Sequence, residues 1–530
     1  MKRITRILYD GLLIALAIAN SAASEAPTLI FKVQFQGPLN GTPALGKDDS
    51  IYINNGFRLR ALSSDGKFLW NGRAPLHGRE WPVSPVVVDD RSVIMASSQG
   101  LLAYSLKDGT ELWHVTGEGW VEQTATPAAG FDGTLFFPVE AENNTRFVAA
   151  IGTDGAVSWT HSFGILQHRF ASPVILQDGK VVINNWYYRI LDTEGYRIGE
   201  YGSLGWYTEG SPAIDQEGLV YGSSWNNKLF CIDQRGQEKW SRTLDAPIVG
   251  GITLARDRNL FFKDTAGNVQ SYCQDGTRRW RKPLNGFTSP FDTEYSVPTL
   301  LGDGTLLVGS GSVQGGIYCL DQTSGDVLWT FRTQGRVVGS VNVDSKNSLI
   351  FGDDNGILYK LAGVSGLGES TWPKYHGDAA NSGRPRLLVD VSAGTGGSIH
   401  QEPRTGAVEH GTQIALAAIP EAGFVFHQWT GGVVSEKNPF ITTAIGNIRI
   451  QAVFKREPFL RVGSIDQDPT QGFRLQVVGK AGRRYAIEAS SDLQSWTSLA
   501  TMTNETVQSE YFDNQARSFT TRFYRARPAE

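Results

Sequence analysis

The stretch LLAYSLKDGTELWHV, Leu101–Val115, recurs along this chain with small changes. Each copy has a small apolar residue, a short polar run, a turn with glycine, and a tryptophan four residues after that glycine. Strand-like runs on both sides of a D-G turn predict two antiparallel strands per copy. The copies end at Trp70, Trp113, Trp159, Trp240, Trp280 and Trp329, with degenerate copies at Ile190–Glu200 and before Trp372.

A second marker runs out of phase with the first, at the start of each unit. It reads Thr42-Pro43, Ser84-Pro85, Thr126-Pro127, Ser172-Pro173, Ser211-Pro212, Ile252, Val297-Pro298 and Val341, so both markers give eight units. Sixty glycines and fourteen tryptophans favour many short strands over helical bundles. Four-stranded repeats of about 40 to 50 residues indicate a propeller, in which each small sheet buries its faces against its neighbours. The predicted fold is all-β: an eight-bladed β-propeller followed by two small β domains.

In such a fold, the recurring tryptophan lies across a junction between two blades, where it buries about 200 Å². This repeat resembles the tryptophan-docked repeat of pyrroloquinoline-quinone (PQQ)-type propellers over residues 30–383. That family includes quinoprotein dehydrogenases and the propeller subunit of the outer-membrane protein assembly machinery. We expect Ile30–Phe35 to supply the fourth strand of the eighth blade, with Thr371–Tyr375 as the alternative. The stretch TWPKYHGDAANSGR, Thr371–Arg384, is expected to seal the propeller or lead out of it.

The sequence predicts four segments. Residues 1–23 read as a signal peptide, with an apolar run before the small residues Ser21 and Ala23; an uncleaved anchor is the alternative. Residues 24–385 form the propeller. Residues 386–456 resemble the divergent internalin-type B repeat, with a core around Phe424 and Trp429. Residues 457–530 indicate a β-sandwich module like those at the C-terminus of many exported bacterial proteins.

The composition limits which classes of partner and which cellular location are expected for this chain. The chain has a net charge of −4 and no basic block, so it lacks the positively charged surface expected of a nucleic-acid-binding protein. No apolar stretch after residue 24 approaches membrane length, so we expect no membrane insertion after signal cleavage. The expected location is outside the cytoplasm of a bacterium, in the periplasm, at the cell surface or in the medium. We expect a monomer.

Signals for catalysis are weak. Cys231, Cys273 and Cys319 occupy equivalent repeat positions, which predicts buried thiols without disulfides rather than the adjacent cysteine pair typical of quinoprotein dehydrogenases. Gly41–Lys47 has the spacing of a phosphate loop but coincides with a blade start. Gly352–Gly356 could bind calcium but falls where each blade turns. We therefore expect no metal and no cofactor; PQQ with calcium belongs only to the dehydrogenase alternative.

A binding site is expected where the loops that lead into the innermost strands converge on one mouth of the central channel. These loops combine aromatic and charged residues, which suit a sugar, a peptide or an extended protein segment, although several could instead fill the channel. The candidate channel-mouth residues are Arg79, Trp81, Trp120, Glu122, Gln123, Arg169, Phe170, Trp206, Tyr207, Glu209, Glu294, Tyr295 and Arg336, with Glu80 and His168 beside them.

The function that the sequence favours is recognition: a non-catalytic exported protein that uses its propeller as a binding platform for a protein, peptide or glycan. The alternatives are a PQQ-dependent dehydrogenase and a periplasmic scaffold for outer-membrane protein assembly. The absence of a cysteine near the predicted cleavage site, and hence of a lipid attachment point, weighs against the scaffold.

Overall fold

The computed structural model describes residues 26–56, 58–72, 83–97, 100–117, 120, 125–142, 144–165, 170–202, 210–284, 296–311, 315–421, 424–456, 467–468, 472–478, 481–506 and 508–529. Apart from one short 3-10 helix, η1 (Ala516–Ser518), the regular elements of these residues are β-strands. Among the same residues, no helix has the length and apolar character needed to cross a bilayer. The predicted signal peptide lies outside the described residues.

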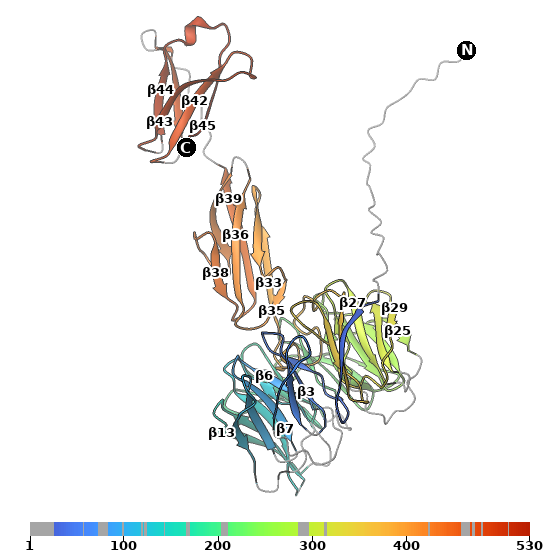
Figure 1. The fold of residues 1–530 in the computed structure, drawn as a ribbon. Helices are drawn as coiled ribbons and strands as arrows, with labels where there is room; N and C mark the ends of the chain where they lie inside the picture. The colour runs from blue at the N-terminus through green and yellow to red at the C-terminus, as the bar shows by residue number, and fades with distance from the viewer. Residues whose placement is uncertain are drawn as a thin grey trace, which may run out of the picture. The chain divides into compact units, whose positions relative to one another are not determined.

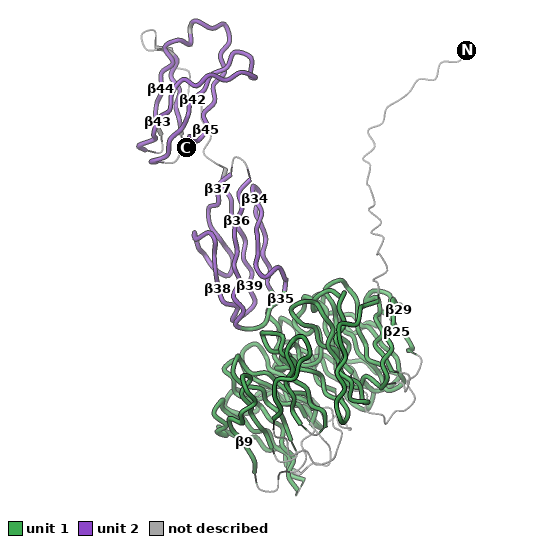
Figure 2. The backbone as a smooth tube through the Cα atoms, in the orientation of Figure 1, with its two compact units in different colours: residues 1–388, 407–410 green, residues 389–406, 411–530 purple. Residues whose placement is uncertain are grey.

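The chain forms two compact units (Figure 2). Unit 1 comprises residues 1–388 together with 407–410, and unit 2 comprises residues 389–406 and 411–530. The propeller predicted for residues 24–385 lies in unit 1. Unit 1 also includes a short later segment, 407–410, that the repeat pattern does not reveal.

The first half of unit 1 contains four antiparallel four-stranded sheets, numbered here in chain order (Figure 1). Sheet 1 consists of β2 (Ala44–Leu45), β3 (Ile51–Asn54), β4 (Leu59–Leu62) and β5 (Phe68–Asn71). Sheet 2 consists of β6 (Val86–Val88), β7 (Ser92–Ser97), β8 (Gly100–Ser105) and β9 (Glu111–Val115). Sheet 3 consists of β10 (Ala128–Ala129), β11 (Leu135–Glu140), β12 (Thr145–Ile151) and β13 (Val157–Ile165). Sheet 4 consists of β14 (Val174–Ile175), β15 (Val181–Asn184), β16 (Tyr188–Leu191) and β17 (Arg197–Tyr201).

The second half repeats this pattern. Sheet 5 consists of β18 (Ala213–Ile214), β19 (Val220–Ser224), β20 (Lys228–Ile232) and β21 (Glu238–Thr243). Sheet 6 consists of β22 (Ile248–Leu254), β23 (Leu260–Asp264), β24 (Asn268–Tyr272) and β25 (Arg278–Pro283). Sheet 7 consists of β26 (Thr299–Leu300), β27 (Thr305–Ser310), β28 (Gly316–Asp321) and β29 (Val327–Phe331). Sheet 8 consists of β30 (Asn342–Val343), β31 (Leu349–Gly352), β32 (Ile357–Ala362) and the N-terminal strand β1 (Thr28–Gln34).

Strand β1 closes the propeller, as the sequence predicts. It pairs antiparallel with β32 from Thr28 opposite Ala362 to Gln34 opposite Ile357, and in Figure 1 the blue strand lies among the yellow ones. The pairing continues beyond the strand, because the Phe35 amide donates to Gly356 O at 2.8 Å. The first and last parts of the repeat array therefore share one sheet, and the alternative closure through Thr371–Tyr375 is wrong.

The recurring tryptophan docks each sheet onto the next. The Trp113 Nε1–H of sheet 2 donates to Thr153 O of sheet 3 at 2.9 Å, and a Cβ on Gly155 would lie 2.9 Å from the indole ring. Trp70, Trp159, Trp240 and Trp280 make the same pair of contacts with the next turn, at Leu106 O and Gly109, Thr193 O and Gly195, Gln274 O and Gly276, and Gln322 O and Gly325. The turn glycine thus serves two needs: positive φ and room for the neighbouring indole.

Three of the eight junctions depart from this rule. Trp329 of sheet 7 lies in a core cluster with Val343 and Leu349 of sheet 8, where no turn joins the third and fourth strands because the fourth strand is β1. In sheet 4, Gly199 takes the tryptophan position, and the backbone of Arg235 in the next turn comes within about 3 Å of where its Cβ would be. At the closing junction, Phe31 of β1 packs its ring on Gly66 in the first turn, with 2.9 Å from a hypothetical Cβ. A phenylalanine, or direct backbone contact, therefore replaces the indole where the repeat is degenerate.

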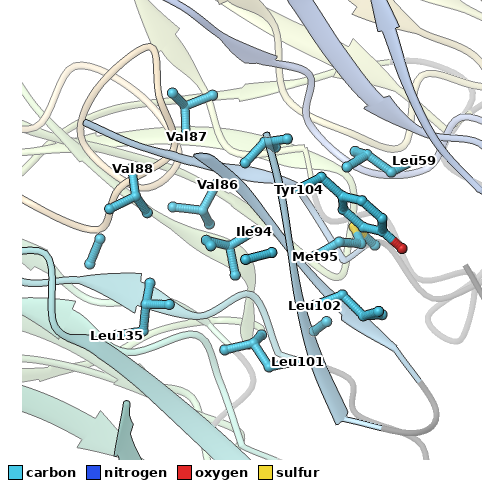
Figure 3. Packing of buried hydrophobic residues seen from close by; sticks show 14 of the residues in the cluster. Leu59, Val86, Val87, Val88, Ile94, Met95, Leu101, Leu102, Tyr104 and Leu135 are labelled. Atoms are coloured by element: carbon cyan, nitrogen blue, oxygen red, sulfur yellow. The ribbon is translucent and has the colours of Figure 1, made fainter. Parts of the chain in front are cut away.

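The hydrophobic core is continuous across neighbouring sheets. Figure 3 shows one cluster, in which the buried residues of β6, β7 and β8 pack with Leu59 from sheet 1 and Leu135 from sheet 3. Val86, Val93 and Leu101 have no exposed surface, and Met95 fills the space beside them. Because each small sheet buries both faces, its inner strands are apolar throughout rather than alternating.

Unit 2 holds the two predicted C-terminal modules. The first has a sheet in the order β35 (Ala407–Val408), β33 (Leu387–Ala393), β39 (Ile448–Arg456), β37 (Phe424–Gly431), and a sheet of β34 (Gly397–Glu402), β36 (Gln413–Pro420) and β38 (Phe440–Thr443). Strand β35 and the start of β33 belong to unit 1. The second module has sheets of β40 (Gln467–Asp468), β41 (Gly472–Val478) and β44 (Gln508–Asp513), and of β43 (Thr497–Thr503), β42 (Arg484–Ser490) and β45 (Phe523–Pro528). Trp429 is fully buried, as expected of a core residue.

Candidate functional site

The hydroxyl groups of the second sequence marker link the innermost strands of neighbouring sheets. The Thr42 amide donates to Ser84 Oγ at 2.9 Å, the Ser84 amide to Thr126 Oγ1 at 3.0 Å, and the Thr126 amide to Ser172 Oγ at 3.0 Å. On the other side, the Ser340 amide donates to Thr42 Oγ1 at 2.9 Å, across the closing junction. The Ser/Thr-Pro marker is therefore a chain of hydrogen bonds around the propeller axis, which satisfies buried amides.

Residues 371–386, called here the plug segment, contact the first strand of every sheet. The contacts, sheet by sheet, are Leu45 N to Ala379 O, Val87 N to Ala380 O, Ala129 N to Ser382 O, Ile175 N to Gly383 O, Thr371 Oγ1 to Ile214 O, Leu254 N to Trp372 O, Leu300 N to Pro373 O, and Asn342 Nδ2 to Ala379 O, all between 2.7 and 3.0 Å. One short segment can reach eight sheets only if the first strands surround it. The plug segment therefore occupies one end of the channel, which confirms its predicted sealing role.

A buried lysine holds the plug segment together. Lys374 has no exposed surface, and its ammonium donates to Tyr375 O, Asp378 O and Asn381 Oδ1 at 2.9, 2.8 and 2.6 Å. Asn381 in turn donates to Thr42 O, Pro43 O and Pro85 O. Burial lowers the pKa of Lys374 to about 7. The three hydrogen bonds of the Lys374 ammonium nevertheless hold the plug segment together. Because Lys374 has no exposed surface, its amine cannot contact a substrate while the plug segment is in place.

Tyr375 and His376 fill the space beside Lys374. The Tyr375 hydroxyl donates to Thr126 Oγ1 at 2.9 Å and lies 3.2 Å from Ser172 Oγ, so the plug joins the hydroxyl chain. The His376 ring stacks on Tyr375 at 4.5 Å, and its Nδ1 lies 3.1 Å from Asn381 O. Burial, followed by the charge of Lys374, lowers the pKa of His376 to about 3, so the imidazole is neutral at physiological pH.

The segment Ala407–His410 covers the outer side of the plug. The Arg386 guanidinium donates to Gly368 O at 2.7 Å and to Ala407 O at 2.6 Å. Glu409 accepts the Ala379 amide at 3.3 Å, and burial together with the nearby Asp378 raises its pKa. The His410 ring lies 4.8 Å from that of Phe131 in sheet 3. This end of the propeller is thus closed by two segments that both follow the repeats.

Most of the predicted channel-mouth residues lie outside the described residues. These are Arg79, Glu80, Trp81, Glu122, Gln123, His168, Arg169, Trp206, Tyr207, Glu209, Glu294 and Tyr295. Their role as a binding surface stays a prediction.

Two of the three described candidates contact sheet 3, and the third lies at sheet 8. Trp120 is half-buried, with its ring 6.1 Å from Phe137 and 5.9 Å from Phe147 in sheet 3. Phe170 is only 5% exposed and meets Phe163 edge-on at 5.2 Å, which makes it a core residue rather than a ligand platform. Arg336 pairs with Asp354 at 2.7 Å and holds the loop before β30 against the β31–β32 turn.

The other motifs raised by the sequence have structural roles. Cys231, Cys273 and Cys319 are free thiols in sheets 5, 6 and 7, and burial raises the pKa of Cys231 and Cys319 to about 12, which leaves them unreactive. Gly352–Gly356 forms the β31–β32 turn, where Asp353 accepts the Gly335 and Ile357 amides. Among the described residues, no group of three or more His, Cys, Asp or Glu side chains is arranged to hold a metal ion.

Comparison with known proteins agrees with this geometry. Residues 22–194 match the family model described as outer membrane protein assembly factor BamB, and residues 387–458 match the divergent InlB B-repeat domain. The chain contains a PQQ-type propeller and a divergent B-repeat module. The comparison with curated proteins found no match.

Solved structures resemble the PQQ-type propeller in fold. BamB from Moraxella catarrhalis is 18% identical, with a TM-score of 0.50, over 63% of this chain and 97% of that one. The computationally designed Ika8 protein is 15% identical, with a TM-score of 0.50, over 63% and 99%. Quinohemoprotein alcohol dehydrogenase from Comamonas testosteroni is 12% identical, with a TM-score of 0.51, over 63% and 76%. At these identities the similarity shows the fold alone.

The PQQ-type propeller raises the question of a quinone with calcium on its axis. At the plugged end, the axis is filled by Lys374, Tyr375 and His376, whose polar groups bond to the protein itself. The three cysteines lie in three different sheets, so none forms the adjacent pair that the dehydrogenases carry. The described residues at the plugged end therefore do not fit a quinone.

Sequence reasoning missed the buried polar cluster within the plug segment. The available signal was the run Lys374-Tyr375-His376 followed by Asp378 and Asn381, an unusual density of polar residues beside the buried Trp372. Such a run in a sealing segment indicates polar groups that bond to the backbone of the surrounding strands.

Proposed function

We propose that this chain is an exported, non-catalytic binding protein whose propeller is a recognition platform for a protein, peptide or glycan. The observation that carries the proposal is the plug segment, which bonds to the first strand of all eight sheets. It fills one end of the channel with side chains of the protein itself, among them Lys374, Tyr375 and His376. The signal-like N-terminus and the B-repeat module support export.

The ligand is proposed to bind at the loops that lead into the innermost strands. Their aromatic and charged residues, with Trp81, Trp206 and Tyr295 as the aromatic anchors, have the composition of a hot spot. None of these three residues occupies the repeat's tryptophan position in the sequence.

The test is a binding screen of the mature chain against glycan and peptide arrays, repeated with a triple variant, Trp81→Ala, Trp206→Ala and Tyr295→Ala. We expect hits whose signal falls at least about tenfold in the variant, since each anchor contributes about 1 to 2 kcal/mol. The matched control replaces two exposed aromatics, Phe68→Ala in β5 and Tyr196→Ala directly before β17, and should keep the signal. Equal loss in both variants, or no hit at all, would contradict the proposal.

The same preparation tests the dehydrogenase alternative. Titration with PQQ and calcium, followed by tryptophan fluorescence and dye-linked alcohol oxidation, is expected to show neither saturable quenching nor dye reduction. Both signals together would make the protein an enzyme and overturn the binding proposal.

A second candidate function is a scaffold for outer-membrane protein assembly, which the family match over residues 22–194 favours. If the protein has this function, it should co-purify stoichiometrically with outer-membrane β-barrel proteins or their assembly machinery. A lipid-anchored scaffold is disfavoured, because no cysteine lies near the predicted cleavage site.

A further inference from the structure

Two side chains of the plug segment, an amine and a carboxamide, contact each other where solvent does not reach. Lys374 Nζ lies 2.6 Å from Asn381 Oδ1, and neither residue has exposed surface. Because a carbonyl bond is about 1.23 Å long, Nζ is within about 3.8 Å of the carboxamide carbon Cγ. Reacting atoms in a near-attack arrangement lie about 3 to 3.5 Å apart, so a small rotation of either side chain brings Nζ to Cγ.

The hydrogen bonds of Lys374 determine where the lone pair of its neutral amine points. Nζ has three oxygen neighbours, which are Tyr375 O at 2.9 Å, Asp378 O at 2.8 Å and Asn381 Oδ1. A neutral amine has only two N–H groups, and when these donate to the two backbone oxygens, its lone pair is directed at the Asn381 carboxamide. Because burial lowers the pKa of Lys374 to about 7, a large fraction of the amine is neutral at physiological pH.

The other side of the carboxamide is surrounded by groups that stabilise a positive leaving group. Asn381 Nδ2 donates to Thr42 O, Pro43 O and Pro85 O at 3.0, 3.2 and 3.2 Å. These contacts identify the nitrogen of the carboxamide, since only an NH₂ group can donate to carbonyl oxygens. When the bond between Cγ and Nδ2 breaks, the nitrogen gains a proton, and three carbonyl oxygens already in place stabilise the positive charge that develops on it.

From this geometry we infer that Lys374 and Asn381 form an intramolecular isopeptide bond, which makes the plug segment a site of covalent self-modification. Nζ attacks Cγ, the bond between Cγ and Nδ2 breaks, and one proton passes from Nζ to Nδ2, which leaves as ammonia. Asp378 and Glu409 act electrostatically on the amine, and a carboxyl group can carry this proton between the two nitrogens. Atoms and electrons balance without an oxidant or a second substrate.

The isopeptide bond closes residues 374–381 into a ring that is already bonded to the backbone beside sheets 1 and 2 through Asn381. Because the carboxamide is fully buried, attack by Lys374 is favoured over attack by water. The ring fixes the turn of the plug segment in the shape that fits the channel, which favours its return after local unfolding. This modification belongs to the plugged end and is independent of the ligand that binds at the channel mouth.

The test is tryptic peptide mapping of the purified mature chain by mass spectrometry, with the protein denatured just before digestion. Trypsin does not cleave after a lysine whose Nζ is acylated, and it cleaves poorly at Arg384, which precedes Pro385. We expect residues 361–386 as one uncut peptide that is lighter than its calculated mass by about 17 Da, the mass of ammonia. Cleavage after Lys360 is the internal control, because Lys360 is also buried but pairs at 2.7 Å with the Asp344 carboxylate, which an amine does not attack.

Three outcomes overturn the inference: peptides 361–374 and 375–386 at their full masses, an uncut peptide 361–386 at its full mass, or a loss of ammonia confined to peptide 375–386. The last outcome marks a succinimide at Asn381 instead of a link to Lys374. Lys374→Arg keeps the buried cation but lacks the amine, so it should show the full mass, whereas Lys360→Arg should keep the loss of about 17 Da. Because the wild-type chain itself is the test, the result stands even where Lys374→Arg does not fold.

Discussion

Tryptophan and glycine form one unit at each docked junction. Trp113 meets Gly155 of the next turn, whose φ is +84°, and any side chain there would enter the space of the indole. The indole N–H also donates a hydrogen bond to Thr153 O. The two residues lie in neighbouring sheets, but each is compatible only with the other at this contact.

We predict that Gly155→Ala is more destabilising than its backbone conformation alone explains. Gly164 has φ +81° with no atom within 4 Å of a Cβ, so Gly164→Ala should cost only about 1 kcal/mol for the left-handed backbone. Gly155→Ala should cost about 2 to 4 kcal/mol, because it adds overpacking against Trp113. Denaturant unfolding of both variants is the measurement.

A double-mutant cycle separates the contact from the backbone. Trp113→Ala alone should cost about 3 to 5 kcal/mol. In that background, Gly155→Ala should cost no more than Gly164→Ala does, which gives a coupling of more than about 1 kcal/mol. Additive effects, or a cost of Trp113→Ala below about 1 kcal/mol, would mean that the indole does not hold the junction.

His376 makes stability depend on pH. Its folded pKa of about 3 lies below the unfolded value of 6.5, so the neutral ring contributes stability above about pH 6.5 that is lost as pH falls toward 3. After burial, the charge of Lys374 also lowers the pKa of His376. Because the unfolded chain binds the extra proton, the slope from this residue is about 1.4 kcal/mol per pH unit.

His376→Asn should flatten this dependence. Asparagine tolerates the φ of +55° and can still donate to Asn381 O, but it does not titrate. The free energy of unfolding of wild type minus variant should fall steadily from about pH 6.5 to about pH 4. Titration of the carboxylates affects both proteins, so parallel stability curves would refute the assignment.

At the scale of elements, β1 is the strand whose place in the sequence least suggests its place in the fold. It pairs with β32, more than 300 residues away, and Phe31 completes the last docking contact. A four-stranded sheet without its outer strand would expose the partner edge of β32.

Deleting residues 24–36 should therefore destabilise unit 1 by about 3 kcal/mol or more, from the half-buried Phe31, Val33 and Phe35. A synthetic peptide, Ala26–Gln36, added in excess should restore the melting temperature in proportion to its binding. The same peptide with Phe31→Ser is the control and should restore less. An unchanged melting temperature after deletion would show that β1 does not close the ring.

At the scale of the whole molecule, the end of the repeats is not the end of unit 1. Leu387 and Ala407 are buried, β33 pairs with β35 there, and Arg386 bonds to Ala407 O. A chain cut at the predicted boundary of residue 385 lacks all of these groups.

We predict that residues 24–385 unfold at a lower temperature than unit 1 within residues 24–456, as measured by calorimetry. Removal of Leu387, Leu388 and Val408 alone takes away three buried apolar side chains, each contributing about 1.5 to 3 kcal/mol. The full chain with Glu409→Gln, which keeps the apolar contacts, is the control and should stay close to wild type. Equal transition temperatures for the two truncated chains would contradict the assignment of 407–410 to unit 1.

The sequence by itself determined the sheets and most of the docking tryptophans, and it favoured the closing strand, because these depend on local patterns repeated along the chain. A turn glycine, a tryptophan four residues later and a Ser/Thr-Pro pair each act within one repeat or on the next one. These patterns can therefore be recognised in the sequence without knowledge of the tertiary structure. The spacing of the repeats also indicates the closing strand, because Ile30–Phe35 lies at the distance before the first unit where a fourth strand is expected.

Only the tertiary structure decided what fills the axis and what borders it. The contacts of Lys374, Asn381 and Arg386 join the plug segment to strands up to about 340 residues away, and no local pattern encodes such pairings. Repeats specify how neighbours pack, whereas a surface made by distant segments exists only once the ring has closed.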